Sequence, residues 1–101
     1  MHNWTPEMGD EKQDRASRVS MCLLGSLRID NEDAEHVVKI RNLSATGLLA
    51  QGHVPIRPGS IVTINIRNIG WVNGIVAWAL DDRFGVVLTR VIDPAKARTL
   101  I

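Results

Sequence analysis

The sequence predicts an all-β fold: a six-stranded antiparallel barrel followed by a short C-terminal helix. Three observations predict it. From Val19 onward apolar residues recur at every second position, which is the period of a strand with one buried face. The connections between these segments are too short for the crossovers that parallel strands need. Short strands with one apolar face each close most economically into a barrel, because closure leaves no strand edge exposed.

The first two strands are predicted on either side of an acidic loop, "DNEDAE". In the second strand, "HVVKIRNLS", Val38 and Ile40 lie on one face and charged residues on the other. In the first strand, "VSMCLLGSLRI", four apolar side chains share one face: Met21, Leu23, Leu27 and Ile29.

Four more strands and a helix complete the prediction. The short apolar segment "TGLLAQG" is the third strand. Asp93 suits a helix N-cap and Pro94 the first helical position, so a short terminal helix follows the last strand. Trp78 is expected in the core, and Trp71 on the opposite face of the same strand. The last three strands each present one apolar face: Val62, Ile64 and Ile66; then Val72, Val76, Trp78 and Leu80; then Phe84, Val86 and Leu88.

Length, composition and charge limit the kind of molecule. At 101 residues and 45% hydrophobic, the chain is expected to form one domain, residues 15–101, after a flexible N-terminal tail of residues 1–14. A formal charge of +1 and 4% aromatic residues argue against a nucleic-acid polymer as partner. No apolar run is long enough to cross a bilayer, and the first residues lack the layout of a signal peptide. We therefore expect a cytoplasmic protein without direct membrane insertion.

The sequence contains no recognisable set of catalytic or metal-ligating residues. No nucleophile-elbow pattern surrounds Ser44, and Asp81 and Asp82 are interpreted as a tight turn. The lone Cys22 is expected to be buried and inert. We expect no enzyme activity, no metal and no cofactor. None of the three histidines has a partner at a spacing typical of a metal site: His2, His36 and His53.

The stretch "NLSATG", residues 42–47, ends the second strand with polar residues. Because residues two apart share a face, Asn42 and Ser44 are expected to continue the apolar row of that strand. Their side chains can donate and accept hydrogen bonds, and Gly47 allows close approach to the backbone. Two interpretations follow: a turn that bonds its own backbone, with glycine at positive φ, or one half of a binding site.

A binding site needs a second element, and two arginines precede the first strand. In "QDRASRVS", Arg15 and Arg18 lie just ahead of Val19. Guanidinium groups suit phosphate and the edge of guanine, and they stack on flat bases. The opposing interpretation is a pair of solvated surface arginines. Through residue 35 the chain carries four basic residues against eight acidic ones, so any anion site should be small and local.

Together these motifs resemble those of the PilZ domain family. That family is recognised by RxxxR ahead of the first strand and by [D/N]xSxxG after the second. Asn42, Ser44 and Gly47 match the second motif in full. The late hairpin "GIVAWALDDRFGVVL" and the helix "DPAKAR" also look like those of the family, so the resemblance covers about residues 15–98.

The arginine motif departs from the family pattern by one residue. Arg15 and Arg18 are three positions apart, whereas RxxxR places them four apart. The residue four positions before Arg18 is Asp14, whose charge is wrong for phosphate. A flexible segment can absorb a shift of one residue, so both arginines are kept as candidate ligand-binding residues.

The resemblance implies a receptor for the bacterial second messenger cyclic di-GMP. The arginines would bind phosphate and guanine, the asparagine and serine would hydrogen-bond either group, and the glycine would let the ligand lie close to the backbone. Ordering of the arginine arm by the ligand would change the surface presented to an effector protein. The implied ligand-binding residues are Arg15, Arg18, Asn42, Ser44 and Gly47.

Two other hypotheses remain open at this point. The first is a PilZ-like adaptor that does not bind the nucleotide, which the shortened arginine spacing favours. The second is a small barrel that binds single-stranded nucleic acid, against which the near-zero charge and few aromatic residues argue. The ligand stoichiometry, the oligomeric state and the regulated pathway are not specified by any motif.

Overall fold

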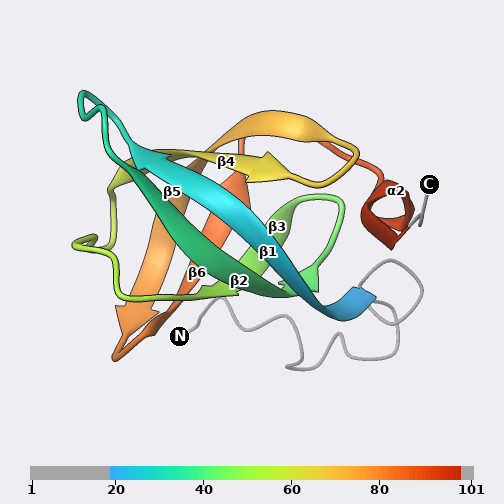
Figure 1. The fold of residues 1–101 in the computed structure, drawn as a ribbon, viewed down its shortest axis with the longest axis horizontal. Helices are drawn as coiled ribbons and strands as arrows, with labels where there is room; N and C mark the ends of the chain where they lie inside the picture. Colours follow the sequence, from blue (N-terminus) through green and yellow to red (C-terminus); the bar gives the residue numbers. More distant parts are fainter. Residues whose placement is uncertain (1–18, 99–101) are drawn as a thin grey trace.

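The computed structural model describes residues 19–98, with side chains from residue 22 to residue 97. Six strands form a closed barrel in the order β1-β2-β3-β6-β5-β4, and all neighbouring strands are antiparallel (Figure 1). The predicted fold class is confirmed. The elements are β1 Val19–Ile29, β2 Glu35–Leu43, β3 Gly47–Gln51, β4 Ile61–Ile66, β5 Gly70–Leu80, β6 Arg83–Leu88 and α2 Ala95–Arg98.

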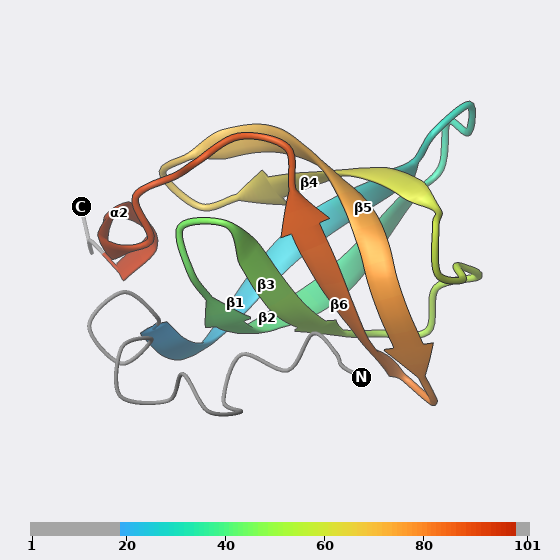
Figure 2. The same cartoon turned by 180° about the vertical axis from the view of Figure 1, so that it is seen from behind.

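The two ends of the barrel differ. The start of β1, the β2–β3 turn and α2 lie at one end, and the β1–β2 and β5–β6 hairpins lie at the other (Figures 1 and 2). Backbone contacts join the first group: Val19 is paired with Leu43, and the Ile92 N–H donates to the Ala45 carbonyl at 2.9 Å. The end that holds α2 therefore brings together the beginning, the middle and the end of the described chain.

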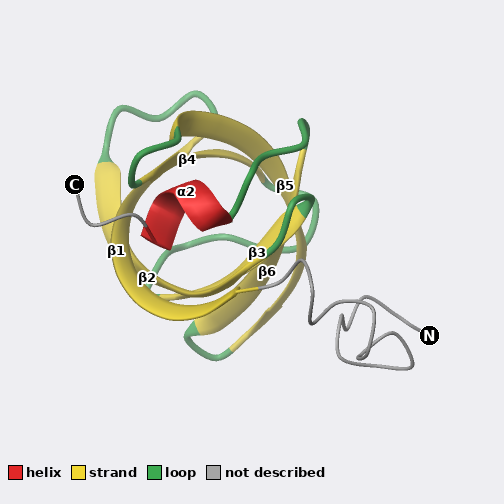
Figure 3. Cartoon of the chain, turned by 90° about the vertical axis from the view of Figure 1, so that its right-hand side faces the viewer, coloured by secondary structure: helices red, strands yellow, loops and turns green. Residues whose placement is uncertain are grey.

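Helix α2 lies across the mouth of the barrel (Figure 3). Asp93 caps it as predicted, because the Ala95 N–H donates to the Asp93 Oδ1 at 3.1 Å. Ala97 packs inward and is 3% exposed. No helix within residues 19–98 is long and apolar enough to cross a membrane.

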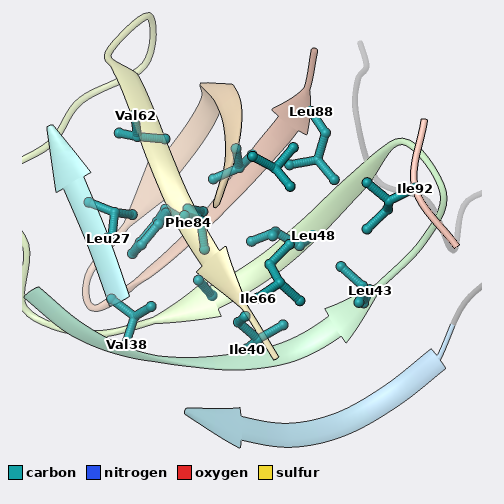
Figure 4. Close-up of a cluster of buried hydrophobic side chains, with 14 of the residues drawn as sticks. Leu27, Val38, Ile40, Leu43, Leu48, Val62, Ile66, Phe84, Leu88 and Ile92 are labelled. Carbon is teal, nitrogen blue, oxygen red and sulfur yellow. The ribbon is translucent and has the colours of Figure 1, made fainter. Parts of the chain in front are cut away.

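The core fills the barrel with aliphatic side chains around one aromatic ring. Phe84 is the largest of the fully buried side chains and lies near the centre of the cluster (Figure 4). Interiors of this kind are close-packed, so the loss of one large side chain leaves a cavity. The predicted apolar faces of β2, β4 and β6 are confirmed by burial: Val38, Ile40, Val62, Ile64, Ile66, Phe84, Val86 and Leu88.

The predicted apolar face of β5 is wrong beyond Val76. A register shift in the pairing of β5 with β6, between Val76 and Trp78, reverses the alternation. Trp78 is opposite Gly85, which lies between two buried neighbours on β6 and so on the outer face of the barrel. Trp78 is therefore only partly buried on the outside, and Leu80 is 69% exposed.

The outer face of β1 is mixed, since it carries Leu24, which is 65% exposed, together with Cys22 and Arg28. Cys22 is exposed, contrary to the prediction, because it alternates with Leu23, which packs against the core. Further along β1, the Arg28 guanidinium forms an ion pair with Glu35 at 2.6 Å and lies 4.9 Å from the ring centroid of Trp71. Trp71 is 40% exposed, as its position on the outer face of β5 predicts.

Candidate functional site

The turn between β2 and β3 is held by one hydroxyl. The Ser44 Oγ accepts hydrogen bonds from the Gly47 N–H at 3.1 Å and the Thr46 N–H at 3.3 Å, and it donates to the Gly47 carbonyl at 3.2 Å. The Ser44 N–H donates to that carbonyl at 2.8 Å. For Ser44, the turn interpretation is confirmed. For Gly47 it is wrong, because the glycines with positive φ among the described residues are Gly59 and Gly70.

The turn is also fixed to the end of β6 and to the chain that follows it. The carbonyl of Thr46 accepts from the Leu88 N–H at 2.8 Å, and that of Ala45 accepts from the Ile92 N–H at 2.9 Å. Each of these hydrogen bonds joins two residues that are more than 40 positions apart in the sequence. The backbone of the turn is therefore held in place by hydrogen bonds from the end of β6 and the segment after it.

Asn42 does not continue the inward row of β2. The pairing of β2 with β3 contains a register shift between Ile40 and Asn42, and the next inward side chain is Leu43, which is fully buried. Asn42 is instead opposite Leu49, which lies between two buried neighbours on β3 and so faces outward. The predicted continuation of the row is wrong because the bulge adds one residue to the alternation.

Four residues from four neighbouring strands form one row on the outer face. Asn42 of β2 is opposite Leu49 of β3, Leu49 is opposite Gly85 of β6, and Gly85 is opposite Trp78 of β5. We call this set the outer row. The row has a polar amide at one end and an indole at the other, with the Leu49 side chain and the buried backbone of Gly85 between them. The Trp78 Nε1 is buried, and no group within residues 22–97 accepts its hydrogen bond.

This row was not predicted from the sequence, although one signal for it is present. A glycine inside a strand often marks a bulge or a close approach of another group, and Gly85 is such a glycine. Its partners Leu49 and Trp78 could not be found, because their positions depend on the register between strands.

The two predicted arginines, Arg15 and Arg18, lie outside the described residues, as does the predicted tail. The start of β1 nevertheless shows where the chain enters the barrel. Val19 is paired with Leu43 and Ser20 with Asn42, so β1 begins directly beside the β2–β3 turn.

A comparison with models of protein families finds a match. The PilZ domain model matches residues 12–101, a range that includes both arginines, the β2–β3 turn and the late hairpin. The chain belongs to the PilZ family. PilZ domains are known as receptors and adaptors for cyclic di-GMP. A comparison with curated proteins finds no match.

One polar chain crosses the outer face of this PilZ barrel next to the outer row. The Arg41 Nη1 donates to the Gln51 Oε1 at 2.8 Å, and the Gln51 Nε2 donates to the Asp82 Oδ2 at 3.0 Å. The bond from Gln51 lowers the pKa of Asp82 below its ordinary 3.8, and the charges of His53 and Arg83 lower it further by smaller amounts. Asp82 is therefore ionised at neutral pH.

We expect an NMR titration of the Asp82 carboxyl group to give a pKa below 3.8. A lowered pKa means that the folded state favours the carboxylate. The stability that this adds is present above pH 3.8 and is lost as the pH falls through the folded pKa. Gln51→Ala should move the pKa of Asp82 back toward its ordinary value. A pKa of Asp82 that does not change in this variant would contradict the assigned cause.

The polar groups near the outer row are an amide, an indole N–H and a guanidinium. Within residues 22–97, no group of three His, Cys, Asp or Glu side chains is placed to hold a metal ion. The outer row of the PilZ barrel presents an amide and an indole, and the Arg41 guanidinium belongs to the polar chain next to the row. These groups suit a ligand with flat bases and negative charge.

Proposed function

We propose that this chain is a cyclic di-GMP receptor that relays the level of the messenger to a protein partner. One observation carries the proposal: β1 begins beside the turn that contains the [D/N]xSxxG motif, with Val19 paired with Leu43 and Ser20 with Asn42. The start of β1, which directly follows the arginine segment in the sequence, thus meets the "NLSATG" segment at one end of the barrel, although some 25 residues separate the two in the sequence.

The position of β1 limits how far the arginines lie from the turn. The Cα of Arg18 is about 3.8 Å from that of Val19, since the two residues are joined by one peptide bond. The Cα of Arg15 is at most roughly 15 Å from that of Val19, even in a fully extended chain. Both guanidinium groups are therefore within reach of a phosphodiester group that lies against Asn42.

Each motif residue has a role in the proposed site. Asn42 hydrogen-bonds a guanine or a phosphate from the outer row. Ser44 and Gly47 contribute through the turn that they form, since the Ser44 hydroxyl holds that turn in shape. A guanine base lies over Gly85, which has no side chain, with the indole of Trp78 beside it.

Ligand binding would be passed on through the arginine segment. The arginines close over the dianionic ligand and fix the segment against the barrel, and this changes the surface that meets an effector protein. The ligand provides the difference in binding energy that such a change requires. Because the messenger is bacterial and intracellular, we place the protein in the bacterial cytoplasm, and we assign it no enzymatic activity.

Isothermal titration of the wild type with cyclic di-GMP tests the proposal, and we expect a dissociation constant in the micromolar range. Asn42→Ala should weaken binding by roughly two- to tenfold, the effect of one neutral hydrogen bond. Asn73→Ala is the matched control, because Asn73 also points outward from its strand but accepts a hydrogen bond from the Thr63 Oγ1 on β4 at 2.9 Å. A wild type that shows no heat of binding at high micromolar ligand would disprove the receptor function.

The second candidate function is a PilZ adaptor that binds its partner without the nucleotide. The arginine spacing favours it, because Arg15 and Arg18 are one residue closer than in RxxxR and Asp14 takes the remaining position. In an adaptor of this kind, the affinity for the effector is the same with and without cyclic di-GMP. In a receptor, the affinity changes with the ligand.

A further inference from the structure

The bulge in β2 turns two consecutive side chains to the same side of the barrel. In a regular strand, neighbouring residues point to opposite faces. Here the inward residues Ile40 and Leu43 are both fully buried, and the two residues between them, Arg41 and Asn42, lie outside the core. Bulges re-aim side chains in this way and are frequent near functional sites. The result is that an arginine and the asparagine of the "NLSATG" motif leave β2 on the same side of the strand.

The Arg41 guanidinium is held in place without being neutralised. Its partner is the neutral amide of Gln51, at 2.8 Å, and within residues 22–97 no carboxylate lies within ion-pair distance of it. Gln51 is in turn oriented by the ionised Asp82, which accepts from its Nε2 at 3.0 Å. This second bond turns the Gln51 Oε1 toward Arg41. One of the five guanidinium N–H donors is then used, and the others are available to a ligand.

We propose that Arg41 is a third guanidinium of the ligand site and binds a phosphodiester group of cyclic di-GMP. This inference rests on the proposed function. Arginine binds phosphate through two parallel hydrogen bonds, and a side chain that is already fixed loses less entropy on binding. Arg15 and Arg18 precede the barrel, whereas Arg41 belongs to a barrel strand. It supplies a fixed positive charge next to Asn42 that does not depend on the spacing of the first motif.

The test is isothermal titration of cyclic di-GMP into four variants. Arg41→Ala should weaken binding roughly ten- to hundredfold, because a charge-assisted hydrogen bond is lost. Arg41→Lys should recover part of this loss, since an ammonium group still neutralises phosphate. Gln51→Ala should weaken binding only a few-fold, because the guanidinium remains but is no longer oriented. Arg67→Ala is the control: it removes an exposed arginine after β4, and binding should stay within about twofold.

The outcomes separate this inference from the proposed function. If the wild type binds and Arg41→Ala binds as tightly as Arg67→Ala, the role of Arg41 is wrong and the receptor function stands. If the wild type does not bind, both are wrong. Thermal unfolding of each variant checks the fold. Arg41 is exposed, so its replacement should leave the melting temperature close to that of Arg67→Ala.

Discussion

Phe84→Ala lowers the free energy of unfolding by about 3–5 kcal/mol. Phe84 is 2% exposed and is the largest of the fully buried side chains. It extends from β6 into the middle of the cluster that lines the barrel (Figure 4). Its removal costs the transfer energy of the ring and leaves a cavity that a closed barrel cannot collapse to fill. Domains of this size are stable by only about 5–15 kcal/mol, so this variant should be close to unfolded.

Urea denaturation followed by circular dichroism measures the change. Leu80→Ala is the matched control, because it removes a similar apolar side chain from the same hairpin at a position that is 69% exposed. Its effect should stay within about 0.5 kcal/mol. Equal losses in the two variants would mean that the barrel interior is not the source of stability. An intact Phe84→Ala barrel with unchanged cyclic di-GMP affinity would show that the outer row does not depend on the core beneath it.

The fold was predictable because the strands alternate regularly over most of their length. In β4 and β6, and in the middle of β2 at Val38 and Ile40, every second residue is apolar, and this pattern identifies the inward face and the all-β class. Closure into a barrel followed from the number of short strands and the shortness of their connections. These are properties of single strands and of chain length, and a sequence displays them directly.

The errors fall where one strand is out of step with its neighbour. Asn42 and Trp78 each follow a bulge, and both point outward although the period of two places them inside. A bulge is a property of a strand pair, because it exists only where two residues oppose one, and a single strand's pattern does not show it. Both bulges also border the candidate site.

Part of the candidate site was predictable for a related reason. Asn42, Ser44 and Gly47 are close in sequence, and a local motif identified them as one turn. Arg41 directly precedes Asn42, but its outward direction depends on the bulge between β2 and β3, and Gly85 joins the site only through the pairing of β3 with β6. The hydrogen bonds of Ser44 within the turn were also predictable from the sequence. A serine hydroxyl commonly accepts from backbone N–H groups two or three residues further along the chain.

Replacing both Arg15 and Arg18 by alanine should abolish binding of cyclic di-GMP at micromolar concentrations. Each charge-assisted hydrogen bond contributes about 1.5–3 kcal/mol, so the loss of two weakens a micromolar complex by two orders of magnitude or more. Isothermal titration measures this effect. The control removes the same total charge from exposed positions elsewhere, as Arg57→Ala with Arg67→Ala. Wild-type affinity in the variant that lacks both Arg15 and Arg18 would contradict the proposed role of the arginine segment.

The single variants and one insertion then show what the shortened spacing does. Val19 is held at the turn by its pairing with Leu43, and Arg18 directly precedes it in the sequence. Arg18→Ala should therefore have a larger effect than Arg15→Ala. An effect of Arg18→Ala alone would mean that Arg15 does not reach the ligand. In that case, inserting one alanine between Ala16 and Ser17 restores the RxxxR spacing and should tighten binding by up to about tenfold, the contribution of one charged hydrogen bond. The same insertion between Gly9 and Asp10 lengthens the chain equally but leaves the motif unchanged, so the affinity should not move.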